Sequence, residues 1–106
     1  MEVNGYEIGP YKNLENAELS NLTLRGIILD EANLKNANLA KSDLQQSSMH
    51  KCNLEGANLE GANLSGVDLR GSNLANTDLT RANFYKADLR GATLAGAKVN
   101  LSLIHI

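Results

Sequence analysis

The chain has 106 residues, a net charge of -2 and only 4% aromatic residues. A chain of this length forms a single domain, and the scarcity of aromatic side chains leaves leucine and alanine to fill its core. Charges of both signs are interspersed, which predicts no strong attraction to nucleic acid or to an anionic membrane, and a single cysteine excludes an internal disulfide.

Residues 1–11, MEVNGYEIGPY, precede the regular part of the chain. They have neither the basic start nor the apolar run of a secretory signal, and we find no stretch long enough to span a bilayer. We therefore expect a cytoplasmic protein without a membrane partner. We expect Tyr6, Ile8 and Tyr11 to cap the first edge of the following region, because an open backbone edge invites pairing with another chain.

Residues 12–100 repeat every five residues without a slip in register. On an α-helix, steps of five would scatter the large apolar residues around the axis, and on one long strand they would alternate between core and water. The spacing instead predicts a chain that turns by the same amount in each repeat, so that every central residue faces the interior. The central residues are Leu14, Leu19, Leu24, Leu29, Leu34, Leu39, Leu44, Met49, Leu54, Leu59, Leu64, Leu69, Leu74, Leu79, Phe84, Leu89, Leu94 and Val99.

The other positions of the repeat each have a typical composition. Two residues before the centre lies a mostly small residue, which is predicted to point inward because two is the strand period. The residue between them is mostly Asn or Asp and is expected at a corner, where its side chain bonds nearby backbone groups. Every glycine beyond residue 12 lies two residues after the centre, which predicts a bend that favours positive φ. The residue directly after the centre varies freely and is predicted to face solvent.

The tandem pattern A-[DN]-L-x-x resembles the pentapeptide-repeat family over residues 12–100. The resemblance implies an all-β fold, a right-handed quadrilateral β-helix in which four repeats make one square coil. Residues 12–100 would then form a solenoid of four to five coils, stacked about 4.8 Å apart. Leu22 and Ile27 occupy positions that are small elsewhere, so we expect a wider, irregular first coil.

Residues 101–106, LSLIHI, break the pattern by placing large apolar residues in the Asn/Asp and bend positions. They also resemble a translated sequencing-adapter sequence. We therefore expect an artefactual, non-native tail and a native chain that continues past Asn100. The alternative is a genuine apolar cap, because Ile104 falls on the central register and Ser102 in the small position. An open coil end would also allow a homodimer through that end.

Nothing in the sequence predicts a catalytic, cofactor or metal site. His50 and Cys52 are close in sequence, but the register places the imidazole outside the coil and the thiol inside it. No Cys or His cluster has metal-ligand spacing, and the recurring glycines open no helix that would bind phosphate. We therefore expect a protein that is not an enzyme and has no cofactor.

Residues twenty apart stack on one face if four repeats make a coil. One such column contains Asp30, His50, Arg70 and Arg90. Asp68 lies two residues before Arg70, and Asp88 lies two residues before Arg90. Each aspartate is expected to neutralise its arginine as an exposed pair. Tyr85 is predicted to be the only exposed aromatic residue of the repeats and is the best candidate for a partner contact; the alternative is an isolated surface aromatic. The candidate surface contacts are Tyr85, Arg70, Arg90 and His50.

These features favour a non-enzymatic structural scaffold or protein-interaction module. One alternative is a DNA mimic that binds DNA gyrase or another type II topoisomerase, as the resemblance implies for some family members. Between residues 64 and 100, however, the two outward loop positions contain Lys and Arg but no acid, which departs from the acidic face of a mimic. The other alternative is the N-terminal repeat segment of a longer protein whose activity lies in C-terminal sequence. Direct nucleic-acid binding is not expected.

Overall fold

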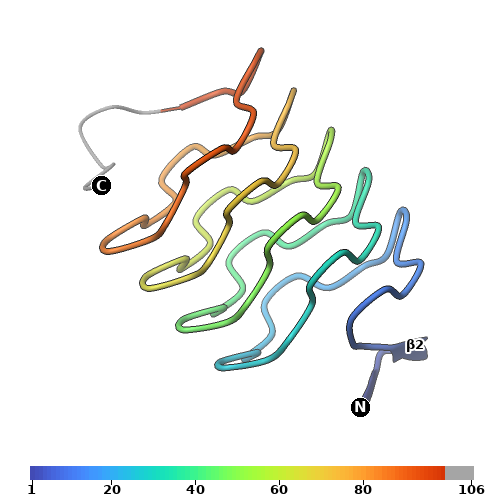
Figure 1. The fold of residues 1–106 in the computed structure, drawn as a ribbon. Helices are drawn as coiled ribbons and strands as arrows, with labels where there is room; N and C mark the ends of the chain where they lie inside the picture. The colour runs from blue at the N-terminus through green and yellow to red at the C-terminus, as the bar shows by residue number, and fades with distance from the viewer. Residues whose placement is uncertain (100–106) are drawn as a thin grey trace.

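The computed structural model describes residues 1–99, most of which wind into square coils stacked along one axis (Figure 1). Isolated parallel bridges join residues twenty positions apart, such as Asn33 to Asn53 and Asn53 to Asn73. Twenty residues are four repeats, so four repeats make one coil. The predicted square coil, with its five-residue register intact, is confirmed.

Each coil has four sides, which we number in chain order by their central residues. Side 1 carries Leu14, Leu34, Leu54, Leu74 and Leu94. Side 2 carries Leu19, Leu39, Leu59, Leu79 and Val99. Side 3 carries Leu24, Leu44, Leu64 and Phe84. Side 4 carries Leu29, Met49, Leu69 and Leu89.

The central side chains form the core, as the register predicts. From Leu14 to Phe84, none is more than 4% exposed. Burying each leucine contributes roughly 2 kcal/mol. Most of the small residues that precede them are buried as well, and Ala37, Ala62 and Val67 are fully enclosed. A narrow tube filled this way leaves no room for a second large side chain opposite each leucine.

Every backbone N–H in a typical repeat has a partner, and residues 33–37 illustrate this. The N–H of Asn33 bonds to the preceding coil at 2.9 Å, and those of Leu34 and Asn36 bond to the following coil at 2.7 and 2.9 Å. The N–H of Ala37 closes the corner onto the carbonyl of Leu34 at 3.0 Å. The N–H of Lys35 donates to Oδ1 of Asn33 at 3.1 Å. The Asn/Asp side chain thus satisfies the one N–H that neither the turn nor a neighbouring coil can reach.

The expectation that Asn and Asp form the corners is wrong. They lie in the middle of the sides, where the bridges form, and the two residues after the centre make the corner. The Asn or Asp side chain accepts the N–H two residues ahead, so the residue lies just before the turn and is not part of it. The predicted bend is confirmed, because every position two after a centre, from Asn16 to Gly96, has φ between 56° and 75°.

Two corners of the first coil depart from the typical turn. Leu22 and Ile27 are too large for the small position and are partly exposed. The Ser42 hydroxyl, one coil later, accepts the N–H of Leu22 at 3.2 Å and donates to the carbonyl of Leu19 at 2.6 Å. Ser47 bridges the corner at Ile27 in the same way. The expected irregularity is therefore confined to these turns, and the twenty-residue register continues through them.

A short hairpin precedes the coils. It consists of β1 (Glu2–Val3) and β2 (Tyr6–Glu7), which pair antiparallel. Tyr6 packs against the end of the core, and Ile8 is only 5% exposed. Both residues therefore pack against the first coil. Tyr11 does not, because its side chain is 74% exposed at a corner.

The expected tail at residues 101–106, and Asn100 before it, lie outside the described residues. Within residues 1–99, no helix has the length and apolar character needed to cross a membrane.

Candidate interaction surface

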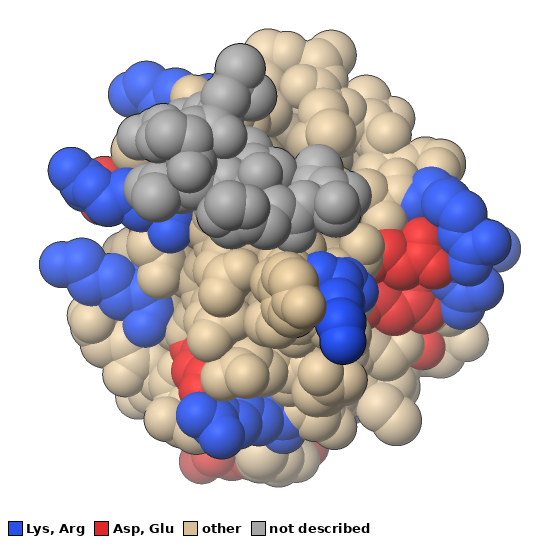
Figure 2. Space-filling view, turned by 90° about the vertical axis from the view of Figure 1, so that its left-hand side faces the viewer, with Lys and Arg blue, Asp and Glu red and all other residues tan. Residues whose placement is uncertain are grey.

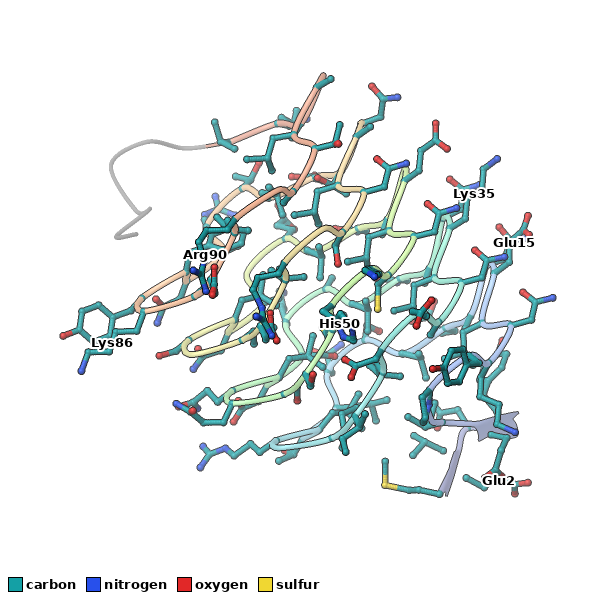
Figure 3. All side chains as sticks on the ribbon, in the orientation of Figure 1. Glu2, Glu15, Lys35, His50, Lys86 and Arg90 are labelled. Atoms are coloured by element: carbon teal, nitrogen blue, oxygen red, sulfur yellow. The ribbon has the colours of Figure 1, made fainter. Side chains whose placement is uncertain are left out.

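The corner between sides 4 and 1 carries the predicted column of charged residues, of which Figure 3 labels His50 and Arg90. Nη2 of Arg70 lies 2.8 Å from Oδ2 of Asp68, and Nη2 of Arg90 lies 2.7 Å from Oδ2 of Asp88. Nε of Arg70 also lies 3.9 Å from Oδ2 of Asp88, so one carboxylate joins two arginines in successive coils. The predicted neutralisation of both arginines by exposed aspartates is confirmed.

These pairs lower the pKa values of their carboxyl groups. Hydrogen bonds from the Arg90 guanidinium, and then from the Arg90 backbone N–H, lower the pKa of Asp88 to about 2. The Arg70 guanidinium lowers the pKa of Asp68 in the same way, against a smaller effect of burial. Both aspartates therefore stay ionised at neutral pH, with their oxygens already occupied by neighbouring donors.

His50 lies in the same column but pairs with Asp30 in the coil before. Its Nδ1 and its backbone N each lie 3.1 Å from Oδ1 of Asp30, which also accepts the Ser48 hydroxyl at 2.6 Å. Burial raises the pKa of Asp30, but the bonds from Ser48 and His50 outweigh it, and the pKa lies below its ordinary value. The column therefore consists of two separate groups, Asp30 with His50 and the arginine–aspartate ladder above them.

Tyr85 lies at the corner between sides 3 and 4, where its side chain is 53% exposed. Its N–H donates to Oδ1 of Asn83 at 2.9 Å, and its carbonyl accepts the N–H of Gly66 at 2.8 Å. Nζ of Lys86 lies 5.3 Å from the centre of its ring (Figure 3). The corner therefore presents an aromatic ring and an ammonium group together from a fixed backbone.

Cys52 and His50 lie on opposite sides of the coil wall, as the register predicts. The thiol is 1% exposed and donates to the carbonyl of Leu29 at 2.8 Å. Burial raises the pKa of Cys52 to about 12. A thiol in this environment is a core side chain and a poor nucleophile.

Charge changes sign along the rod. Residues 1–63 contain nine carboxylates and five Lys or Arg residues, a net charge of -4, whereas residues 64–99 contain three and five, a net charge of +2. Figure 2 looks along the rod from its C-terminal side and shows Lys and Arg side chains projecting around the rim, with carboxylates beside some of them. The C-terminal coils therefore lack the broad acidic face of a DNA mimic.

A family profile described as pentapeptide repeats, in 8 copies, matches residues 27–66 and 62–100. The chain belongs to the pentapeptide-repeat family. Its coils form the right-handed quadrilateral β-helix of that family. Pentapeptide-repeat proteins are generally non-enzymatic, scaffold-like folds. A search of curated proteins gave no match.

Several solved pentapeptide-repeat structures are similar to this chain. The protein alr5209 from Nostoc PCC 7120 is 26% identical, with a TM-score of 0.62 over 84% of this chain and 85% of that chain. Rfr23 from the cyanobacterium Cyanothece 51142 is 29% identical over 84% of each chain, with a TM-score of 0.42. HetL from Nostoc sp. strain PCC 7120, which is involved in heterocyst differentiation regulation, is 32% identical over 81% of this chain and 48% of its own, with a TM-score of 0.36.

Sequence reasoning found the arginine–aspartate pairs because two signals coincide at them, the spacing of two within a repeat and the spacing of twenty between coils. It missed the contact between Lys86 and Tyr85, although the two residues are adjacent in the chain. Adjacent residues at a corner point in directions that depend on the turn, and the turn places Lys86 at a φ of 60°. A basic residue next to an exposed aromatic at a bend is the signal that could have identified this contact.

Proposed function

We propose that this pentapeptide-repeat protein is a non-enzymatic interaction module that presents fixed side chains to a protein partner. The observation that carries the proposal is Tyr85, an aromatic side chain more than half exposed at a hydrogen-bonded corner. Tyrosine is among the residues that most often dominate the energy of protein interfaces.

The rigidity of the surface supports this function. The corner that holds Tyr85 is bonded through both its N–H and its carbonyl, and Arg70 and Arg90 are held by their aspartates. Side chains that are already ordered lose less conformational entropy when a partner binds. His50, fixed by Asp30, extends the same surface toward the N-terminal coils.

The proposal is tested by placing a photo-crosslinking phenylalanine analogue at position 85 and, as a control, at position 75. Ala75 occupies the same place in its repeat but on the corner between sides 1 and 2. We expect a protein from the source cells to be crosslinked at position 85 and not at position 75. We also expect Tyr85→Ser to abolish retention of that protein without changing the circular dichroism spectrum. Equal crosslinking from both positions, or full retention by Tyr85→Ser, contradicts the proposal.

A further inference from the structure

We infer that the partner binds through a short acidic protein segment, which docks on one side of the C-terminal coils. This inference rests on the proposed interaction function. The docking surface, which we call the basic surface, spans side 4 and its two corners. Its members are Lys51, Arg70, Tyr85, Lys86 and Arg90, with Asp68 and Asp88 between the arginines.

The carboxylates of the basic surface are engaged within the chain, whereas its cations retain free donors. Oδ1 of Asp88 accepts Nε and the backbone N–H of Arg90, and Oδ2 accepts Nη2 of Arg90. Asp68 is held by Arg70 in the same manner. A guanidinium has five N–H groups, so donors remain on each arginine for a second carboxylate. Four cations against two carboxylates leave a net charge of +2 on this surface.

The two lysines lie at opposite corners of the basic surface. Lys86 lies over the Tyr85 ring, which keeps its ammonium at the corner between sides 3 and 4. Lys51 lies on the other corner, one coil below Arg70, and its side chain runs across Gly71, with Cγ 3.3 Å from the position that a Cβ there would occupy. The two lysines therefore flank side 4, whose aspartates pair with Arg70 and Arg90. The Tyr85 ring offers an apolar contact beside Lys86.

The charge of the rest of the rod limits the length of the partner segment. The basic surface spans three coils, and two coil spacings are roughly 10 Å. Beyond it, residues 1–50 contain seven carboxylates and four Lys or Arg residues, a net charge of -3. Screening at physiological salt extends over about 8 Å, so a long polyanion lying along the rod would meet repulsion within one or two coils. A short acidic segment of a protein fits this distribution better than a nucleic acid.

Fluorescence anisotropy with three labelled probes tests the inference. The probes are a decapeptide of alternating Glu and Gly, its Lys and Gly counterpart, and a ten-nucleotide oligothymidylate. We expect the Glu peptide to bind at low salt and to weaken as NaCl is raised. The double variant K51E/K86E should weaken it at least fivefold. The control K12E/K35E makes the same change of net charge at side 1 and its corner with side 2, away from Tyr85, and should weaken it less than twofold.

Four results would overturn the inference. Equal weakening by the two double variants would mean that only net charge matters. Equal binding of the Lys peptide would remove the charge preference, and tighter binding of the oligothymidylate would make nucleic acid the partner class. If crosslinking still depends on position 85 while the Glu peptide fails to bind, the acidic segment is wrong and the interaction function stands. Loss of the dependence on position 85 contradicts the function itself.

Discussion

The contacts that a Cβ would make in place of a corner glycine depend on the side chain one coil below it. A Cβ on Gly66 would overlap the amide of Gln46, and one on Gly56 would overlap the amide of Asn36. Gly26 has the same kind of backbone, with φ +68°, but nothing lies within 4 Å of its Cβ position. At some corners a Cβ would therefore have to displace a side-chain amide of the coil below, whereas other corners accept Asn, Lys or Gln with φ near +60°.

Replacing Gly66 with alanine should destabilise the protein more than replacing Gly26. Both variants place a side chain at positive φ, which costs on the order of 1 kcal/mol. Only Gly66→Ala also displaces the Gln46 amide. Thermal unfolding followed by circular dichroism should show the larger loss for Gly66→Ala, and the added variant Gln46→Ala should remove the excess. Equal losses at the two glycines would show that the contact with Gln46 does not matter.

The ion pair of Asp88 should make stability depend on pH in a narrow acidic range. The pKa of Asp88 falls from the ordinary value of 3.8 to about 2 in the folded chain. At pH values between these two, the unfolded chain binds a proton that the folded chain does not, so stability falls as pH decreases. The contribution is complete above pH 3.8 and is lost as pH falls through about 2.

Asp88→Asn should therefore lower Tm at pH 7, and the difference from the parent should shrink as pH approaches 2. The measurement is a series of melting curves between these values. A difference in Tm that stays constant over the whole range would mean that Asp88 stabilises the fold through its shape and hydrogen bonds rather than its charge.

At the scale of the turn, a serine hydroxyl can replace a corner hydrogen bond. Ser42 inserts between Leu22 N–H and Leu19 C=O, accepting the first and donating to the second. Ser72 does the same beneath Cys52, accepting its N–H at 3.0 Å. In the sequence these serines are simply small residues. Their role depends on which residue lies twenty positions earlier, and that spacing is known only once the coil is known.

Ser42→Ala should cost about 1–3 kcal/mol, because it leaves a backbone N–H and a carbonyl without a partner at a partly buried corner. Ser65→Ala is the matched control. Ser65 lies at a corner position one coil later on the same side, where only its backbone is bonded, and its change should stay within about 0.5 kcal/mol. The measurement is chemical denaturation of both variants. If Ser42→Ala is as mild as the control, the corner closes without the hydroxyl.

Features that are determined within one repeat were predicted from the sequence more accurately than features that depend on the geometry of the turn. The inward leucines follow from the five-residue period and the positive-φ bends from the one repeat position that holds the glycines, and both are observed. The corner was placed two to three residues too early, because an Asn side chain that bonds backbone is equally compatible with a position inside a turn and one just before it. Of the candidate surface, the arginine–aspartate pairs were predicted, whereas the ring contact of Lys86 was missed although the adjacent basic and aromatic residues at a bend are visible in the sequence.

At the scale of the whole molecule, each coil contacts only the coils next to it, so stability is a sum over neighbouring interfaces. The hairpin of β1 and β2 covers one end of this stack, where the Tyr6 hydroxyl accepts the N–H of Glu18 and the amide of Asn4 donates to its carbonyl. These bonds fill backbone positions that a further coil would otherwise satisfy. A destabilising substitution in the middle of the stack should therefore weaken the coils on both sides of it. A substitution near an end should weaken the coils on one side only.

Leu59→Asp tests this view and the inward register together. Leu59 is 0% exposed in the middle of side 2, so the variant buries an unpaired carboxylate, which should cost roughly 4 kcal/mol or more, a large part of the stability of a small domain. Hydrogen exchange should show lost protection in the adjacent coils, at Leu39 and Leu79, before the hairpin is affected. Leu94→Asp is the control, because that side chain is already 41% exposed and its carboxylate stays hydrated. If Leu59→Asp melts at the temperature of the parent protein, the leucines do not face inward, and if protection is lost evenly along the chain, the rod unfolds as one unit rather than coil by coil.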